Sequence, residues 1–114
     1  MYNIFTTKIY QNYSLKKLNA FKLAIKAKFF AEIESINDLK NIIFTPDFIN
    51  IKKLAIGDGY NILFTKDFDG MVIKVAFKGR KVIKETNDYS ILEVAAGENW
   101  DSLVRFAIKN NLHG

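Results

Sequence analysis

The sequence predicts a single mixed α+β domain. Three observations support this class: an alternating apolar stretch at residues 24–33, a capped amphipathic helix directly after it, and a second capped helix near residue 100. Four short apolar segments of strand character lie between the helices, so the expected element order is β-α-β-β-β-β-α. A length of 114 residues sets the limit at one domain, and 49% hydrophobic residues are ample for a packed core.

The first strand follows a segment of weak pattern. Residues 1–18 show little periodicity and carry several Asn, Thr and Lys, so we expect a lead-in arm before a domain at residues 19–114. Residues 24–33 then alternate between an apolar and a charged face, which predicts a half-buried strand. The apolar face comprises Ile25, Ala27, Phe29, Ala31 and Ile33.

Both helices are marked by their caps. Ser35 and Asp38 form a capping box at the start of the first helix, which Thr45-Pro46-Asp47 is expected to end. Asn99 caps the second helix, and Asn110-Asn111 is a suitable end for it. The apolar stripe of this second helix is formed by Trp100, Leu103, Val104, Ala107 and Ile108.

The remaining strands are short. Residues 53–56 and 71–77 are apolar, and residues 81–85 and 90–96 flank a plausible hairpin turn at Thr86-Asn87-Asp88. We interpret Asp67-Phe68-Asp69-Gly70 as a turn with Phe68 in the core, because the glutamate that a calcium loop needs is absent. We interpret Gly97-Glu98-Asn99-Trp100 as a strand-to-helix junction with a buried indole.

A glycine loop at residues 57–61, GDGYN, follows the strand at residues 53–56. It is either a tight turn between strands or a loop whose bare backbone amides hold a phosphate. A dinucleotide fingerprint of the Rossmann type is rejected, since Ile62 stands where the third glycine belongs and no helix follows.

Composition excludes several functions. The chain has no cysteine and a single histidine, His113, so we expect no disulfide, no thiol nucleophile and no metal site. The net charge of +5 is spread along the chain, so we do not expect a nucleic-acid partner. No apolar run approaches the roughly 20 residues of a membrane span, so we expect a cytoplasmic protein. No convincing acid–base pair or nucleophile is present, so we expect no catalytic residue in this chain.

Several segments together resemble the UDP-N-acetylenolpyruvoylglucosamine reductase (UDP-N-acetylmuramate dehydrogenase) family. They are Asn19-Ala20-Phe21, AIGDGYNILFTKDFDGMVI, KGRKVI and EVAAGENWDSLVRFAIKNNLHG, in the family's order from Asn19 to Gly114. The resemblance implies the N-terminal subdomain of a vanillyl-alcohol-oxidase/PCMH-type FAD-binding domain, with a mixed sheet and two helices. It also implies FAD as cofactor, NADPH as co-substrate, and reduction of UDP-N-acetylglucosamine enolpyruvate to UDP-N-acetylmuramate in peptidoglycan synthesis.

The resemblance assigns the FAD pyrophosphate to one loop, formed by Ile56, Gly57, Asp58, Gly59, Tyr60, Asn61 and Ile62. Two positions depart from the family: Tyr60 stands where Ser is usual, and Ala20 where Thr is usual. The family's catalytic serine, glutamate and arginine lie beyond the position of Gly114, so we expect this chain alone to be inactive. An isolated subdomain also exposes apolar surface that its partner would cover, so we expect the chain to be able to self-associate. The alternative is a free-standing, non-catalytic relative that has lost flavin and acts as an interaction module.

Overall fold

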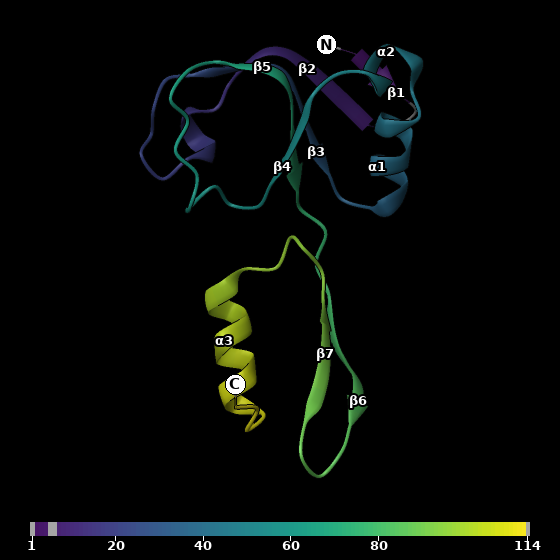
Figure 1. The fold of residues 1–114 in the computed structure, drawn as a ribbon, viewed down its shortest axis with the longest axis vertical. Coiled ribbons are helices and arrows are strands. Elements are labelled where there is room, and N and C mark those ends of the chain that lie inside the picture. The colour runs from purple at the N-terminus through teal and green to yellow at the C-terminus, as the bar shows by residue number, and fades with distance from the viewer. Residues whose placement is uncertain (1, 5–6, 114) are drawn as a thin grey trace.

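The computed structural model describes residues 2–4 and 7–113. Figure 1 shows two parts: a sheet with helices at its side, and below it a hairpin with one helix. The described residues extend over 50 × 32 × 20 Å. The two parts are joined where the last strand of the sheet continues into the hairpin (Figure 1).

The larger part is a five-stranded mixed sheet in the order β1-β2-β3-β5-β4. Its strands are β1 Tyr2–Ile4, β2 Thr7–Ser14, β3 Lys26–Ile33, β4 Lys53–Ile56 and β5 Phe68–Val75. The first three strands are antiparallel, whereas β3, β5 and β4 run parallel. Ile33 pairs with Val75 and Ile56 with Lys74, so the carboxyl ends of the three parallel strands reach the same edge.

The structure differs from the expected arm at residues 1–18, of which residues 1, 5 and 6 lie outside the described residues. Strand β2 pairs with β3 along most of its length, and the short 3-10 helix η1 Lys16–Leu18 follows it. Ile9 and Leu15 are fully buried. The sequence pattern missed β2 because its buried residues change face: Thr7 and Ile9 are buried, whereas Tyr10 and Tyr13 are half-buried against the second cluster, so no single alternation runs through the strand.

Helices cover one face of the sheet. Helix α1 Ile36–Ile43 begins at the predicted cap, where Ser35 Oγ accepts a hydrogen bond from the Asp38 amide at 3.1 Å. Helix α1 ends before Thr45-Pro46-Asp47, as predicted, and Pro46 is the first residue of a second short helix, α2 Pro46–Ile49, a position that proline favours. These helices bury Ile42 and Phe48 against β3 and β5, with Phe29 meeting Phe48 edge to face.

Irregular chain covers the other face. Leu15, Phe30, Phe64 and Val72 form a second buried cluster with Ala27 and Ile56, under the loops before β3 and after β4. The predicted turn at residues 67–70 is wrong, because β5 begins at Phe68 and runs through Gly70. A Cβ on Gly70 would lie 2.4 Å from the Lys52 carbonyl oxygen, so this glycine serves close strand packing rather than a turn.

The smaller part is a separate hairpin, β6 Arg80–Glu85 and β7 Ser90–Val94, followed by α3 Trp100–Lys109. The predicted hairpin turn is confirmed: Thr86 Oγ1 accepts hydrogen bonds from the amides of Asp88 and Tyr89. The Asn99 cap is also confirmed, with Oδ1 accepting from the Ser102 amide at 3.0 Å. The prediction that the Trp100 indole is buried is wrong, because Trp100 is 77% exposed.

The expected mixed sheet with two helices is therefore found together with a second, two-stranded sheet and a third helix in the described part of the chain. None of the helices described is long and apolar enough to cross a lipid bilayer.

Candidate functional site

The glycine loop begins at the end of β4, on the sheet edge where the parallel strands end. Ile56 is 4% exposed and Ile62 packs against the second buried cluster, so both ends of the loop are anchored in the core. Between these anchors, Gly57, Asp58, Tyr60 and Asn61 are exposed. Of the seven predicted residues, Ile56 is thus the last residue of β4 and the other six follow it, with Gly57, Asp58, Tyr60 and Asn61 accessible and Gly59 buried.

The two glycines of the loop play different roles. Gly59 is buried at a φ of +77°, and a Cβ on it would lie 1.9 Å from the Leu18 carbonyl oxygen. Gly57 has no atom within 4 Å of its Cβ position. Gly59 therefore allows the loop to pack against the end of η1, whereas Gly57 leaves the backbone open to approach from solvent.

The charge of the loop bears on what it can bind. Asp58 is the only charged residue among residues 56–62. An anion held here would be bound by backbone amides, as in other glycine-rich anion sites, and not by a cationic side chain of the loop. Tyr60 is 68% exposed, so its ring is not packed into the core beneath the loop. Gly57 and Tyr60 are thus both on the solvent side of the loop.

A second feature adjoins the same edge. Gly97 is buried, and a Cβ on it would lie 2.4 Å from the Phe77 carbonyl oxygen and 2.9 Å from that of Val75. The Lys78 ammonium donates to the Gly97 carbonyl, and the Gly79 amide donates to Glu98 Oε1 at 2.9 Å. Since Ile56 pairs with Lys74, the loop start and this junction both adjoin the last residues of β5.

Sequence reasoning identified the 97–100 junction but missed the residues that hold it. Lys78 and Gly79 lie in a connection of no periodicity, and their contacts span 19 positions of sequence. Arg80 adds a further link, donating to the Ser102 carbonyl at 2.9 Å with its guanidinium 4.8 Å from the Phe106 ring centre. The signal that could have found them is the charged run KGRK directly after a buried strand.

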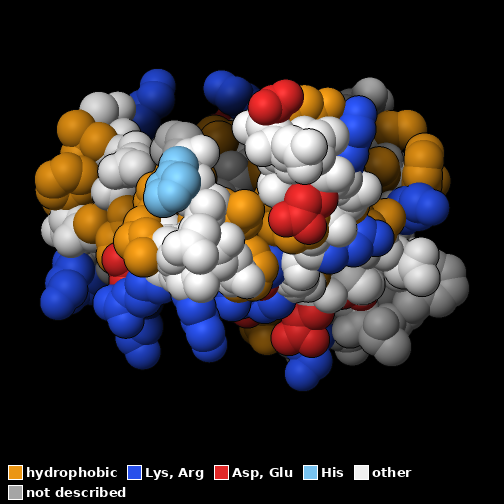
Figure 2. Space-filling model, turned by 90° about the horizontal axis from the view of Figure 1, so that it is seen from below, with side chains coloured by type: hydrophobic (Ala, Val, Ile, Leu, Met, Phe, Trp, Pro, Cys, Tyr) orange, Lys and Arg blue, Asp and Glu red, His pale blue; other side chains and the backbone are white. Residues whose placement is uncertain are grey.

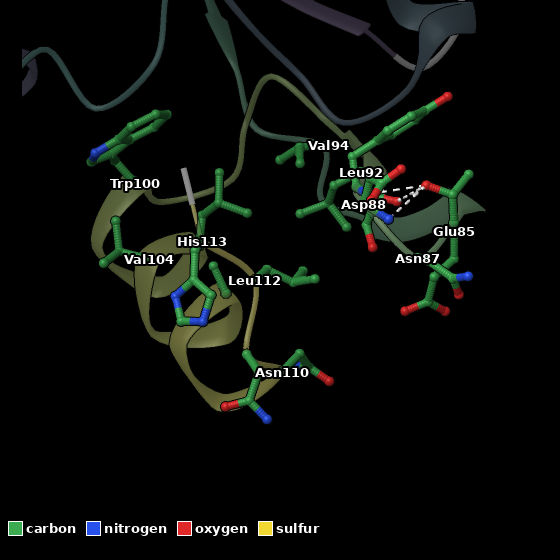
Figure 3. A pocket seen from close by; sticks show the side chains of 16 residues that line it. Glu85, Asn87, Asp88, Leu92, Val94, Trp100, Val104, Asn110, Leu112 and His113 are labelled. Atoms are coloured by element: carbon green, nitrogen blue, oxygen red, sulfur yellow. Dashed lines mark hydrogen bonds between the residues drawn. The ribbon is translucent and has the colours of Figure 1, made fainter.

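An open groove of about 770 Å³ separates the hairpin from α3. Figure 3 shows Leu92 and Val94 on the hairpin side and Trp100, Val104 and Leu112 on the helix side. Seen from this end of the molecule, hydrophobic side chains reach the surface at several places, with Lys and Arg spread around the rim (Figure 2). No residue of β6, β7 or α3 is buried.

Comparison with known proteins defines the class. The sequence model of a family described as "FAD binding domain" matches residues 27–114, and the chain belongs to this family. The match includes the glycine loop, the 97–100 junction and both parts of the fold. A loop with an open glycine at the end of a parallel strand is thus set in a flavin-nucleotide binding family.

The chain is also similar in sequence to individual enzymes. The chain is 42% identical over 106 residues to the UDP-N-acetylenolpyruvoylglucosamine reductase of Flavobacterium johnsoniae, covering 93% of this chain and 31% of that protein. It is 39% identical over 104 residues to the same enzyme of Amoebophilus asiaticus, and 35% identical over 100 residues to that of Chromobacterium violaceum. These matches cover 91% and 88% of this chain, and 31% and 29% of those enzymes. The predicted resemblance is confirmed, and the chain spans less than a third of the length of these relatives.

Proposed function

We propose that this chain is the first α+β subdomain of the FAD-binding domain of a flavoenzyme. In the proposed reaction NADPH reduces UDP-N-acetylglucosamine enolpyruvate to UDP-N-acetylmuramate, a step of peptidoglycan synthesis. Residues 7–18 belong to the subdomain in this proposal, because β2 is an integral strand of its sheet. Family membership and the relatives support the proposal, and the open backbone at Gly57 is the structural observation that carries it.

The part of this chain is to bind and orient the cofactor. Bound FAD supplies the hydride-transfer chemistry of such enzymes. The backbone amides between Ile56 and Ile62 hold the pyrophosphate, and the exposed Asn61 side chain is available to the same ligand. The proposal places no catalytic residue in this chain, so the chain alone binds the cofactor without reducing substrate.

Binding by this chain alone is expected to be weak. Only one side of the pyrophosphate site is supplied, so the purified protein is expected to be colourless. Its exposed groove between hairpin and helix also leads us to propose that the isolated chain self-associates through that surface. No residue of α3 is buried, so the apolar side chains of this helix remain accessible to solvent. Covering them with a second copy of the chain is the physical reason for such association.

The experiment is a titration of the chain with FAD and, separately, with riboflavin, followed by flavin fluorescence. Riboflavin lacks the pyrophosphate, so the proposal predicts that FAD binds and riboflavin binds much more weakly. Tyr60→Ser is titrated alongside, because a gain in FAD affinity would place the exposed ring against the cofactor. FAD binding no tighter than riboflavin in both forms would reject the proposal and favour a flavin-free relative acting as an interaction module.

A further inference from the structure

Asn19 is a buried polar residue outside the glycine loop. Its side chain is 5% exposed and lies in the turn between η1 and β3. Its Nδ2 donates to the Leu15 carbonyl at 2.8 Å and the Leu23 carbonyl at 3.3 Å, and its Oδ1 accepts from the Leu23 amide at 3.1 Å. One side chain thus bridges both ends of the turn.

The turn has backbone hydrogen bonds of its own, including one from the Leu18 amide to the Leu15 carbonyl at 2.9 Å. The Leu23 amide, however, donates to the Asn19 side chain and not to the backbone. Lys22 has a φ of +52°, an uncommon conformation for a residue with a Cβ. The Lys22 amide donates to the Asn19 carbonyl at 3.1 Å, and the Asn19 side chain closes the next position at Leu23. Without that side chain, the carbonyl of Leu15 and the amide of Leu23 would lose these partners.

The residues on either side of Asn19 contact the glycine loop. Leu18 presents its carbonyl to Gly59, with the Cβ position of that glycine only 1.9 Å from the oxygen. The Ala20 amide donates to the Gly59 carbonyl at 3.3 Å. Gly59 therefore packs against Leu18 and accepts a hydrogen bond from Ala20, the two neighbours of Asn19 in the chain.

We propose that Asn19 is a positioning residue for the phosphate-binding loop, acting through Leu18 and Ala20 on Gly59. The proposal rests on the proposed function for its ligand, but the contact between turn and loop is independent of any ligand. Few replacements serve here: Asp lacks the two amide donors, and Gln would place the same amide one methylene farther from both carbonyls. The short, two-sided amide of asparagine is what the turn requires.

The test compares Asn19→Ser with wild type by amide resonances and hydrogen exchange. Asn19→Ser is expected to speed exchange of the Ala20 amide about tenfold, the effect of losing one net hydrogen bond, and to shift the Gly59 and Tyr60 amide resonances. Thr7→Val is the matched control, because Thr7 Oγ1 donates to Asp38 Oδ1 at 3.0 Å on the helix-covered side of the sheet. This control is expected to lower stability while leaving the loop resonances in place.

If Asn19→Ser does not fold, amide hydrogen exchange of the wild-type protein tests the positioning role of Asn19 instead. The Leu23 amide is bonded to the Asn19 side chain and the Ala20 amide to Gly59, so the proposal predicts that both open together with the same urea dependence. Independent opening of these amides, or unshifted loop resonances in a folded Asn19→Ser, would overturn it.

FAD affinity is measured on the same variants. A loss in Asn19→Ser but not in Thr7→Val ties the positioning to the cofactor. If wild type binds no FAD while the loop resonances still shift, the proposed function fails and the positioning role stands.

Discussion

Gly59 packs against the backbone of Leu18 so closely that its Cβ position lies 1.9 Å from the Leu18 carbonyl oxygen. Gly57, two residues earlier in the same loop, has no neighbour within 4 Å of its Cβ position. One glycine of the pair is thus required by the fold, and the other is left free by it. The two positions offer a way to separate folding from binding.

Gly59→Ala is expected to destabilise the fold by at least about 2 kcal/mol, since a Cβ meets backbone and the φ of +77° is strained for alanine. Urea unfolding followed by circular dichroism measures this loss. Gly57→Ala is the matched control and should remain within about 0.5 kcal/mol of wild type. Equal stability of the two variants would show that the close approach to Leu18 is not present.

Asp38 links stability to pH. The hydrogen bond that its carboxylate accepts from the Glu34 amide lowers the pKa of Asp38 below its ordinary 3.8, burial opposes this shift, and the Thr7 and Ser35 hydroxyls add to it. Because the folded-state pKa is lowered, the stabilisation is complete above pH 3.8 and is lost as the pH falls through the folded pKa.

Asp38→Asn tests this linkage, since the amide carries no charge and its single oxygen can accept from the Glu34 amide or from the Thr7 hydroxyl but not from both. At about pH 7 the variant is expected to be less stable by about 1 kcal/mol, and the gap should close at about pH 2. Urea midpoints at the two pH values measure it. Asp88→Asn, at the exposed hairpin turn, is the control for the substitution itself and should stay within about 0.5 kcal/mol of wild type at about pH 7. A gap that persists in acid would argue against the linkage.

Trp100 reports on the groove. It is the chain's only tryptophan and is 77% exposed, so dilute protein should emit like free tryptophan in water. Self-association through the groove would shift the emission to the blue as concentration rises. Val104→Glu places a charge on the groove wall and should weaken association in sedimentation velocity.

Phe44→Glu provides the comparison for that experiment. Phe44 is an equally apolar residue, 71% exposed, at the end of α1 in the larger part of the fold. Its replacement should leave the association unchanged. If Phe44→Glu weakened the association and Val104→Glu did not, the contact between copies would lie at the end of α1 and not at the groove.

Local signals predicted much of the fold. Ser35 and Asn99 both accept hydrogen bonds from the predicted amides, because capping is decided within three residues of sequence. The alternation in β3 was partly informative: Phe29, Ala31 and Ile33 are buried on one face as predicted. Ala27 is buried too, but a register shift between Ala27 and Phe29 places it in the cluster of the other face. Phe30 on the opposite face is buried as well, by loops that no local pattern indicates.

Long-range features were not predictable in this way. Strand β2 owes its place to pairing with β3 across an irregular connection, and Gly70 is explained only by the Lys52 backbone beside it. The glycine loop at residues 57–61 was predicted from its residue types, yet the sequence could not show which glycine faces Leu18. The exposure of Trp100 escaped prediction because an apolar helical stripe normally implies a covering surface within the same chain.

In the proposed site, the backbone at Gly57 lies against the pyrophosphate of FAD. The direct measurement is the FAD dissociation constant of Gly57→Ala against wild type, with Lys81→Ala at the distant hairpin as control. A methyl group on an open backbone should obstruct the phosphate without harming the fold. We expect the FAD affinity of Gly57→Ala to be at least about tenfold weaker, equal to about 1.4 kcal/mol, with unchanged urea stability and an unaffected control. Undiminished FAD affinity in a folded Gly57→Ala would contradict it.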